Sequence, residues 1–256
     1  MNILIIADLH LDLWARAGRD PFAGIVPVLR DLDALIIAGD LANDPQRNWP
    51  WALSRITRLV SPAWIWVIPG NHDYYGTTLD DGVLARIAAE TGAHLAQKSV
   101  LTFGSCRILC YTLWTDFALL GDPGSAMERA KMAMADYGRI RRKDGDISTP
   151  QDTAAIHRDH LDWLTHEIAK PWRGQTVVVT HHAPSAAAAG PCPASVQPLP
   201  RILMAGSMHT GPTAGSSVIP ISRSQPASAG RGSSTSRSAI PARCPKAVRP
   251  TVCCAA

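Results

Sequence analysis

The sequence predicts an α/β fold with parallel strands in at least one sheet. Three observations support this prediction. Short apolar runs of strand length alternate with helix-like segments, and each run ends in a cluster of polar residues. The chain has 256 residues, which is long enough for one sizeable domain with a core. Because strands that alternate with helices favour a parallel sheet, we expect a single α/β domain.

Six segments are predicted to be strands. Four are apolar runs: Asn2–Ala7, Ala34–Ala38, Ala63–Ile68 and Thr176–Thr180. The other two are Val100–Phe103 and Arg107–Tyr111, and the Gly104-Ser105 pair between them predicts a β-hairpin.

Helix-like segments lie between and after these strands. They are Pro27–Leu32, Trp51–Val60, Leu79–Thr91 with Gly92 as its stop, and Ser125–Tyr137, followed by a charged loop at Arg139–Asp146. The clearest helix begins after Thr149, which can cap it, with Pro150 in the first turn and Asp152 three residues after the cap. Its apolar stripe is Ile156, Trp163, Leu164 and Ile168, and Pro171 marks its end.

The composition changes after Pro184. All 21 acidic residues lie at or before Glu167, whereas seven of the 25 Lys and Arg residues follow His182, so the net charge is −3 up to His182 and +7 after it. Aromatic residues also stop at Trp172. Because Ala, Ser, Pro, Gly and Arg bury too little apolar surface to offset the entropy of ordering, we expect residues 185–256 to be a low-complexity tail, disordered or poorly packed. The domain prediction is therefore 1–184 plus this tail.

The cysteines and the N-terminal segment favour a cytoplasmic protein without a membrane span. The sequence has no basic leader before Ile3, no cleavage site and no apolar stretch of spanning length. No CxxC pair occurs, so we expect free thiols rather than disulfides or a zinc site. The six cysteines are Cys106, Cys110, Cys192, Cys244, Cys253 and Cys254.

Four of the apolar runs end in side chains that can bind metal ions. The clusters are Asp8-Leu9-His10, Gly39-Asp40, Gly70-Asn71-His72-Asp73 and His181-His182. The carboxyl ends of parallel strands share one edge of a sheet, so we expect these clusters to converge there. Residues two apart in an extended segment project to the same side, so Asp8 and His10 can hold one ion together. Gly39 and Gly70 allow tight backbone turns.

The mixture of carboxylate, amide and imidazole ligands indicates the kind of metal. It suits Mn, Fe or Zn better than Ca or Mg, which favour all-oxygen ligands. The carboxylate of Asp40 can bridge two ions through its two oxygens. Two ions roughly 3.5 to 4 Å apart polarise phosphoryl oxygens and lower the pKa of a bridging water. This pattern therefore favours hydrolysis at phosphorus, with two divalent ions as cofactors.

In this order, the four clusters, ending in Thr180-His181-His182-Ala183-Pro184, resemble the motif series of the calcineurin-like metallophosphoesterases over roughly Met1 to Pro184. The resemblance implies a sandwich of two mixed β-sheets flanked by helices and a phosphate-ester substrate. It also implies that Asp8 and His10 hold one ion, Asp40 bridges, and Asn71 and His181 hold the other. His72 would contact the substrate phosphate and act as an acid. The segments Leu113–Phe117 and His10–Trp14 resemble a bacterial branch of the family.

The sequence departs from that family after His181. Family members continue with a Gly-His-x-His element that supplies one histidine to each ion, and this chain has none. The nearest match is Gly206-Ser207-Met208-His209, in which Ser207 stands at the first histidine position, and His209 is a weak ligand candidate. We expect the reading frame to shift between about Pro184 and Arg201. If neither alternative frame of the gene encodes Gly-His-x-His downstream, the hypothesis fails.

Several residues keep two interpretations open. His182 either lines the site or points away from it, because side chains alternate along a strand. Tyr74 and Tyr75 either shape the pocket or only pack. The run Arg139, Arg141, Arg142 and Lys143 either meets an anionic substrate or is a solvated loop. We place His94 in a polar loop, and expect partial burial or exposure to explain His157, His160 and His166.

Three functions remain to be separated. The leading hypothesis is a metal-dependent phosphoesterase that acts on a monoester, a diester, a nucleotide or a phosphoprotein, with nucleic acid only as a possible substrate. The second is a non-catalytic remnant of such an enzyme. The third is a binding module whose basic tail attracts nucleic acid, although this tail lacks aromatic residues for stacking on bases. The sequence gives neither the substrate nor the oligomeric state.

Overall fold

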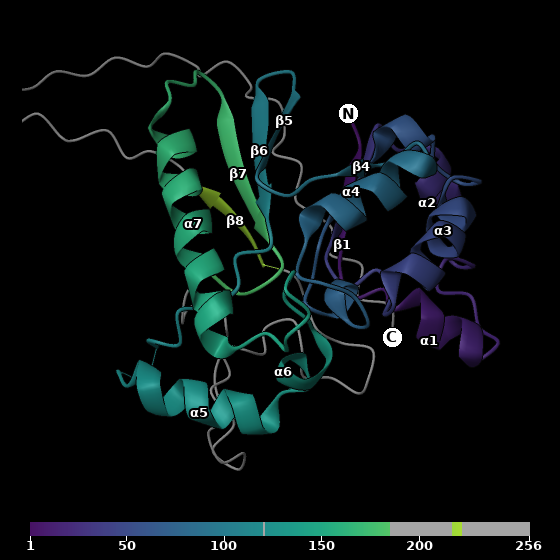
Figure 1. Cartoon of the computed structure of the whole chain (residues 1–256). Helices are drawn as coiled ribbons and strands as arrows, with labels where there is room; N and C mark the ends of the chain where they lie inside the picture. The colour runs from purple at the N-terminus through teal and green to yellow at the C-terminus, as the bar shows by residue number, and fades with distance from the viewer. Residues whose placement is uncertain (120, 185–216, 222–256) are drawn as a thin grey trace, which may run out of the picture.

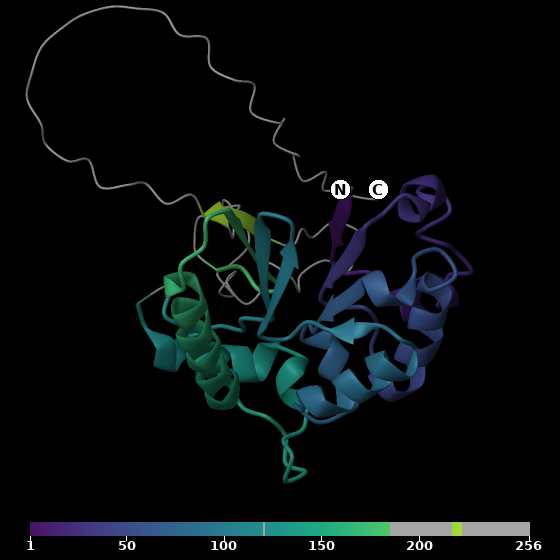
Figure 2. The same cartoon turned by 90° about the horizontal axis from the view of Figure 1, so that it is seen from above.

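Two four-stranded β-sheets form the centre of the molecule, and helices cover their outer sides (Figures 1 and 2). The computed structural model describes residues 1–119, 121–184 and 217–221, the last range only by its backbone. The first sheet has the order β1 (Ile3–Ile6), β2 (Ala34–Ala38), β3 (Ile65–Ile68), β4 (His94–Leu95). The second has the order β5 (Ser99–Phe103), β6 (Cys106–Tyr111), β7 (Gln175–Thr180), β8 (Ser217–Ile221).

The two sheets differ in strand direction. All neighbours in the first sheet are parallel. In the second sheet β5 and β6 form an antiparallel hairpin, β6 and β7 are parallel, and β7 and β8 are antiparallel. The expected pair of sheets flanked by helices is therefore present. Only the second sheet is mixed among the strands that the structure describes.

The helices follow the strands in chain order. They are α1 (Leu11–Arg16), α2 (Val26–Arg30), α3 (Pro45–Ile56), α4 (Asp81–Glu90), α5 (Pro123–Ala133), α6 (Asp136–Arg139) and α7 (Pro150–Ala169), with short 3₁₀ turns at Pro62–Trp64 and His72–Tyr74. In Figure 1, α1 to α4 lie on the side of the first sheet, and α7 runs along the second.

Alternating side chains of β2 separate two apolar layers. Leu35 and Ile37 face the helices and join a core with Trp49, Leu53 and Leu84. The alternate residues of β2, Ile36 and Ala38, face the second sheet. They form the layer between the sheets together with residues of β3, β6 and β7: Ile68, Ile108, Cys110 and Val179. The period of two along a strand explains this division, and it makes β2 fully buried on both faces.

The outer face of the second sheet is covered by α7. Trp163, Leu164 and Ile168 from the predicted apolar stripe pack on Leu109 and Tyr111 of β6. The cap of this helix is also as predicted. Asp152 N donates to Thr149 Oγ1 over 3.3 Å and Thr149 N donates to Asp152 Oδ2 over 2.8 Å, which completes a capping box.

Several boundaries differ from the sequence predictions. The α3 helix begins at Pro45, six residues before the predicted start at Trp51, and it contains Pro50. The segment predicted as one helix over Ser125–Tyr137 is two, because the backbone becomes extended at Met134. Helix α1 was not predicted.

The placement of His94 in a loop was wrong. His94 belongs to β4, and its ring stacks on Trp66 of the neighbouring strand with the ring centroids 5.6 Å apart. A strand of two residues is too short to show an alternating pattern in the sequence.

Part of the expected tail is described. Ser217–Ile221 forms β8 at the edge of the second sheet, which the composition did not predict. The other residues of 185–256, including His209 and four of the six cysteines, lie outside the described residues. Cys106 and Cys110 are free thiols, as expected. None of the helices in the described part of the chain combines the length and apolarity that crossing a bilayer requires.

Candidate metal centre

The predicted ligands meet at the carboxyl ends of the strands. The backbone ladder between β1 and β2 continues beyond the strands, because Asp8 N donates to Gly39 O over 3.0 Å and His10 N donates to Asp40 O over 2.9 Å. Asp8, His10 and Asp40 have φ values of 54°, 41° and 57°. The first two are therefore not in the extended conformation that the sequence argument assumed. These left-handed turns bring both segments to the same crevice.

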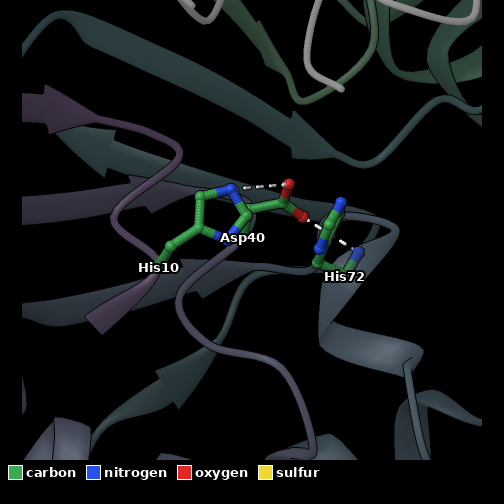
Figure 3. Close-up of side chains that lie close together, drawn as sticks. All are labelled: His10, Asp40 and His72. Atoms are coloured by element: carbon green, nitrogen blue, oxygen red, sulfur yellow. Dashed lines mark hydrogen bonds and ion pairs between the residues drawn. The ribbon is translucent and has the colours of Figure 1, made fainter. Parts of the chain in front are cut away.

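Asp40 lies at the centre of the cluster and is fully buried. Its Oδ1 accepts a hydrogen bond of 3.0 Å from His72 N and lies 3.5 Å from His181 Nε2. Its Oδ2 lies 3.6 Å from His10 Nε2. Figure 3 shows the His10 ring and the His72 backbone on opposite sides of this carboxylate. Both oxygens of Asp40 thus face candidate metal ligands.

Two groups of potential ligands share Asp40. One consists of His10, Asp40 and His72, and the other of Asp8, Asp40 and His181, with the ligand atoms of each group within 4.8 Å of one another. Asn71 adjoins the second group, since its Oδ1 lies 3.1 Å from His181 Nε2. All of the sequence-predicted site residues therefore come together at this edge of the first sheet.

The hydrogen bonds of His181 reveal a place for a cation. Its Nδ1 must donate to Ala38 O over 2.9 Å, because a carbonyl oxygen can only accept. In the neutral ring, Nε2 then carries a lone pair, which faces Asn71 Oδ1 at 3.1 Å and Asp40 Oδ1 at 3.5 Å. Three lone pairs that face one another repel unless a proton or a metal cation lies between them. This arrangement fits a bound metal ion.

Other buried atoms of the cluster also lack partners. Both carboxylate oxygens of Asp8, together with His10 Nδ1 and Asp40 Oδ2, have no hydrogen-bond partner among the described residues. Burial raises the pKa of Asp8 to about 8, with His181 opposing and the carboxylates of Asp40 and Asp73 adding to the increase. Burial, and then Asp73, also raise the pKa of Asp40. A divalent cation would supply the positive charge that these buried carboxylates need to be stable in their ionised form.

Close packing explains the two glycines. A Cβ on Gly39 would lie 2.0 Å from His181 Nδ1, and Gly39 has a φ of 99°. A Cβ on Gly70 would lie 2.1 Å from Asp40 Oδ1. Gly39 therefore provides both a turn and space, whereas Gly70, which has no positive φ, provides space for the central carboxylate.

His72 is held at the rim of the cluster. Its Nδ1 lies 2.9 Å from Asn43 Oδ1, and the amide orientation of Asn43 is fixed because its Nδ2 donates to Asp12 Oδ2 over 3.0 Å. Nδ1 is therefore the protonated nitrogen, and Nε2 is free. Burial, and then the neighbouring His10, His181 and Arg139, lower the pKa of His72 to about 3. The ring is thus neutral at neutral pH.

Comparison with known families agrees with this geometry. The sequence profile described as calcineurin-like phosphoesterase matches residues 1–206, which is most of the chain. The chain belongs to the calcineurin-like phosphoesterase family. Comparison with curated proteins returned no match. Members of the family are phosphoric ester hydrolases that typically bind two metal ions, and a phosphate ester is the substrate class that the family implies.

In this calcineurin-like phosphoesterase, Asp73 joins the loops that carry the ligands. Its carboxylate accepts hydrogen bonds from Asp40 N and Gly70 N, both at 2.8 Å, from Trp49 Nε1 at 3.0 Å and from Ala42 N at 3.2 Å. Burial raises the pKa of Asp73 to about 6, although these donors oppose the shift. Asp73 belongs to the Gly70–Asp73 motif, but its sequence position gave no sign of this structural role.

Asp136 is another supporting residue that the sequence did not predict. It is buried, and its Oδ1 accepts hydrogen bonds from Asn71 Nδ2 over 2.9 Å and from Tyr75 Oη. The bond to Nδ2 turns the Asn71 Oδ1 toward His181. Asp136 lies 65 positions from Asn71 at the start of α6, so no local pattern could have paired the two residues.

The other histidines in the described ranges lie outside the ligand groups. The His182 ring stacks on Trp114 with the centroids 5.1 Å apart, and its backbone N donates to Thr112 O over 3.0 Å. His160 Nδ1 accepts a hydrogen bond of 3.1 Å from Leu113 N, and His157 Nδ1 lies 3.2 Å from Leu113 O. Both positions on α7 are buried and support the segment that follows β6.

Proposed function

We propose that this chain hydrolyses phosphate esters with two divalent metal ions, Mn, Fe or Zn, bound at the carboxyl edge of the first sheet. The observation that carries the proposal is the position of Asp40. It belongs to both groups of ligands, and its two oxygens face different histidines at 3.5 and 3.6 Å. A single carboxylate between two sets of unpartnered ligand atoms favours a pair of ions over one.

Each candidate ligand has one role in this proposal. Asp8 and His10 would hold one ion, Asn71 and His181 would hold the other, and Asp40 would contribute to both. Asp8 differs from its geometric group in this assignment, because its carboxylate lies within 4.8 Å of ligand atoms of Asp40 and His181. The ions, when bound, supply Lewis-acid activation of the phosphoryl group and of the attacking water. Gly39 and Gly70 leave space for His181 and Asp40, and Asp73 keeps their loops together.

His72 contacts the substrate and moves a proton. Because Asn43 binds Nδ1, Nε2 is the ring nitrogen of His72 that remains for the substrate phosphate. The ring is neutral before substrate binds, since its pKa is lowered to about 3 mainly by burial. A phosphate dianion beside Nε2 favours the protonated ring, which can then donate that proton to the leaving oxygen.

Hydrolysis of an aryl phosphate tests the proposal directly. We expect purified full-length protein to release aryl alcohol with added Mn²⁺, and chelator to abolish the release. Asp40→Asn should lower kcat/KM at least about a hundredfold, because one bridging oxygen is replaced by an amide nitrogen. Asp162→Asn, an exposed change on α7, is the control. Turnover that persists in chelator, or that Asp40→Asn leaves unchanged, would refute the mechanism.

One observation favours a second candidate, a non-catalytic remnant of such an enzyme. The sequence lacks Gly-His-x-His, and Ser207 stands where the first of its histidines is expected. Loss of one imidazole from each ion would lower the affinity for both. Metal analysis of purified protein separates the candidates, because a remnant would contain almost no metal and would gain no thermal stability from added Mn²⁺ or Zn²⁺.

A further inference from the structure

A shallow, open cavity of about 430 Å³ lies next to the residues that contact His72. Two of its lining residues contact the His72 ring. Tyr75 lies against it with the ring centroids 4.2 Å apart, and Asn43 Oδ1 lies 2.9 Å from Nδ1. Arg139, Arg141 and Asp44 also line the cavity. Through Asn43 and Tyr75, the cavity therefore adjoins the residue that is proposed to protonate the leaving group.

Backbone hydrogen bonds fix Arg139 beside this loop. Gly76 N donates to Arg139 O over 3.3 Å, Arg141 N donates to Thr77 O over 3.2 Å, and Leu79 N donates to Arg141 O over 2.7 Å. The segment that carries both arginines thus pairs with the chain that leaves the His72 motif. The position of Arg139 follows from the backbone, although its side chain is exposed.

The guanidinium of Arg139 lies over the Tyr75 ring, 5.4 Å from its centroid. The Tyr75 ring also contacts His72, so His72, Tyr75 and Arg139 lie against one another in turn, beginning at the ligand cluster. Tyr75 is held in this row by its hydroxyl, which donates to the buried Asp136. The contact with an aromatic ring orients the guanidinium and leaves its N–H groups for another partner.

The charges around the cavity favour an anion. Within the described ranges, Arg139 forms no ion pair with a carboxylate. Arg141 is partly engaged, because its Nη1 donates to Gly145 O over 2.8 Å. Asp44 is the one carboxylate among the lining residues, against two guanidinium groups. An uncompensated guanidinium in a hollow next to a phosphate site is suited to bind a carboxylate or a phosphoryl group.

We propose that the substrate carries a second anionic group on its leaving-group side, and that Arg139 binds this group in the cavity. The inference rests on the proposed phosphate-ester hydrolysis, because His72 marks the leaving-group side. It narrows the substrate class to phosphate esters of anionic alcohols, in which the second group is a carboxylate or another phosphoryl group. Simple esters of neutral alcohols would leave the cavity unused.

Three aryl phosphates with the same ring test this inference. They are 4-(phosphonooxy)benzoate, its methyl ester, and 1,4-phenylene bisphosphate. The kcat/KM of the bisphosphate is halved before comparison, because the compound carries two equivalent phosphate esters. For the Mn²⁺-loaded full-length protein we expect the benzoate or the bisphosphate, which both carry a second anionic group, to have a kcat/KM about tenfold above that of the methyl ester. Whichever of the two compounds exceeds the methyl ester by more shows whether the cavity prefers a carboxylate or a phosphoryl group. Arg139→Ala should remove most of this ratio, and Arg139→Lys should retain part of it.

Arg142→Ala is the matched control. It removes the same charge from the same segment, but the Arg142 guanidinium pairs with Asp144 and Asp146 and does not line the cavity. The same compounds are also titrated calorimetrically into chelator-treated protein, which reports binding without hydrolysis. Anion preference in binding that depends on Arg139 supports the inference even if nothing is hydrolysed. Hydrolysis or binding without anion preference, a preference that Arg139→Ala leaves intact, or no binding of any compound would overturn it.

Discussion

Three of the candidate ligands have unfavourable backbone conformations. Asp8, His10 and Asp40 all have left-handed φ values, a conformation that costs on the order of 1 kcal/mol or more for residues with a side chain. Asp and His tolerate this region better than branched residues. Hydrogen bonds between the two loops hold the first two residues in place. Three of the eight non-glycine residues with a positive φ in the described part of the chain are candidate ligands, and strain at these positions supports a functional role for the two loops.

Gly39 should not tolerate a side chain. In Gly39→Ala the new Cβ would meet the His181 ring, and the φ of 99° would remain strained. We expect a loss of about 3 kcal/mol or more in the free energy of unfolding, measured by urea denaturation. Gly104→Ala is the control, because Gly104 also has a positive φ, 60°, but nothing lies within 4 Å of its Cβ position. Equal losses in both variants would contradict the clash with His181.

Asp136 should control metal affinity without touching the metal. In Asp136→Ala the Asn71 side chain loses the acceptor that fixes its amide, so Oδ1 is no longer held toward His181. We expect the affinity for Mn²⁺ or Zn²⁺ to fall about 10- to 100-fold, measured by competition with a chelating dye. Asp136→Asn, which keeps an acceptor oxygen, should lose less. If Asp136→Ala binds metal as tightly as Asp162→Ala, an exposed change on α7, the role assigned to Asp136 is wrong.

At the scale of elements, Arg107 joins α7 to the second sheet. This buried residue of β6 donates from Nη1 to Glu167 O over 3.1 Å and to Lys170 O over 3.3 Å, and from Nε to Thr176 Oγ1 over 2.8 Å. The last carbonyls of a helix have no partner within it, and a cation at that end is favourable. One side chain thus anchors the end of the helix on two strands.

Arg107→Ala should therefore destabilise the fold. The substitution leaves the largely buried carbonyl groups at the end of α7 without a hydrogen-bond donor. We therefore expect a loss of about 2–4 kcal/mol in the free energy of unfolding. Arg158→Ala, an exposed change on the same helix, should cost less than about 0.5 kcal/mol. Thermal or urea unfolding of the two variants checks this. A similar small loss in both would show that the Arg107 hydrogen bonds contribute little.

The sequence predicts elements where the signal is local. Ala34–Ala38 is a strand with the predicted boundaries, because five apolar residues between polar ones can hardly be anything else at that length. The cap at Thr149 is equally local. The α1 helix was missed because its first residues follow His10, which offers no side-chain cap. The start of α3 was missed although Asp44 and Pro45 are typical of an N-cap and a first helical residue, because Pro50 lies inside the helix and the predicted start came directly after it.

In the candidate site, too, the sequence predicts some residues and not others. The strand-end rule brought Asp8, Asp40 and Asn71 together, because it depends only on the order of parallel strands in the first sheet. His181 reaches them from the end of β7 in the second sheet, which that rule did not predict. The sequence did not predict Asn43, Asp73 and Asp136 as supports. Each acts through a hydrogen bond to a residue distant in the chain or to backbone amides, and such pairings depend on the packed fold.

At the scale of the whole molecule, metal binding should stabilise the protein, and more so at higher pH. Burial raises the folded-state pKa of Asp8 to about 8 from 3.8, so its contribution to metal-free stability is fully present below pH 3.8 and is lost as pH rises through 8. Binding a cation requires the ionised carboxylate, so the ion must displace a proton at lower pH.

We therefore expect added Mn²⁺ or Zn²⁺ at about 100 times its Kd to raise the Tm by roughly 5–10 °C at pH 8. At a fixed metal concentration the increase should be smaller at pH 6. Differential scanning fluorimetry with and without chelator measures both values. The Asp8→Asn variant is the control, and its shift should depend less on pH. A shift that is absent, or that is larger at pH 6, would contradict the assignment of Asp8 as a ligand.

The hydrogen bond from His181 to Ala38 O spans 143 positions and connects β7 of the second sheet with β2 of the first. Contacts between such distant segments form late, since a long loop must close before they are made. A nascent chain that has completed only its first sheet therefore holds four of the five candidate ligands and lacks His181. The chain would bind an ion with full affinity only once the two sheets have packed together. A luminescent or paramagnetic cation would therefore report on that late step of folding.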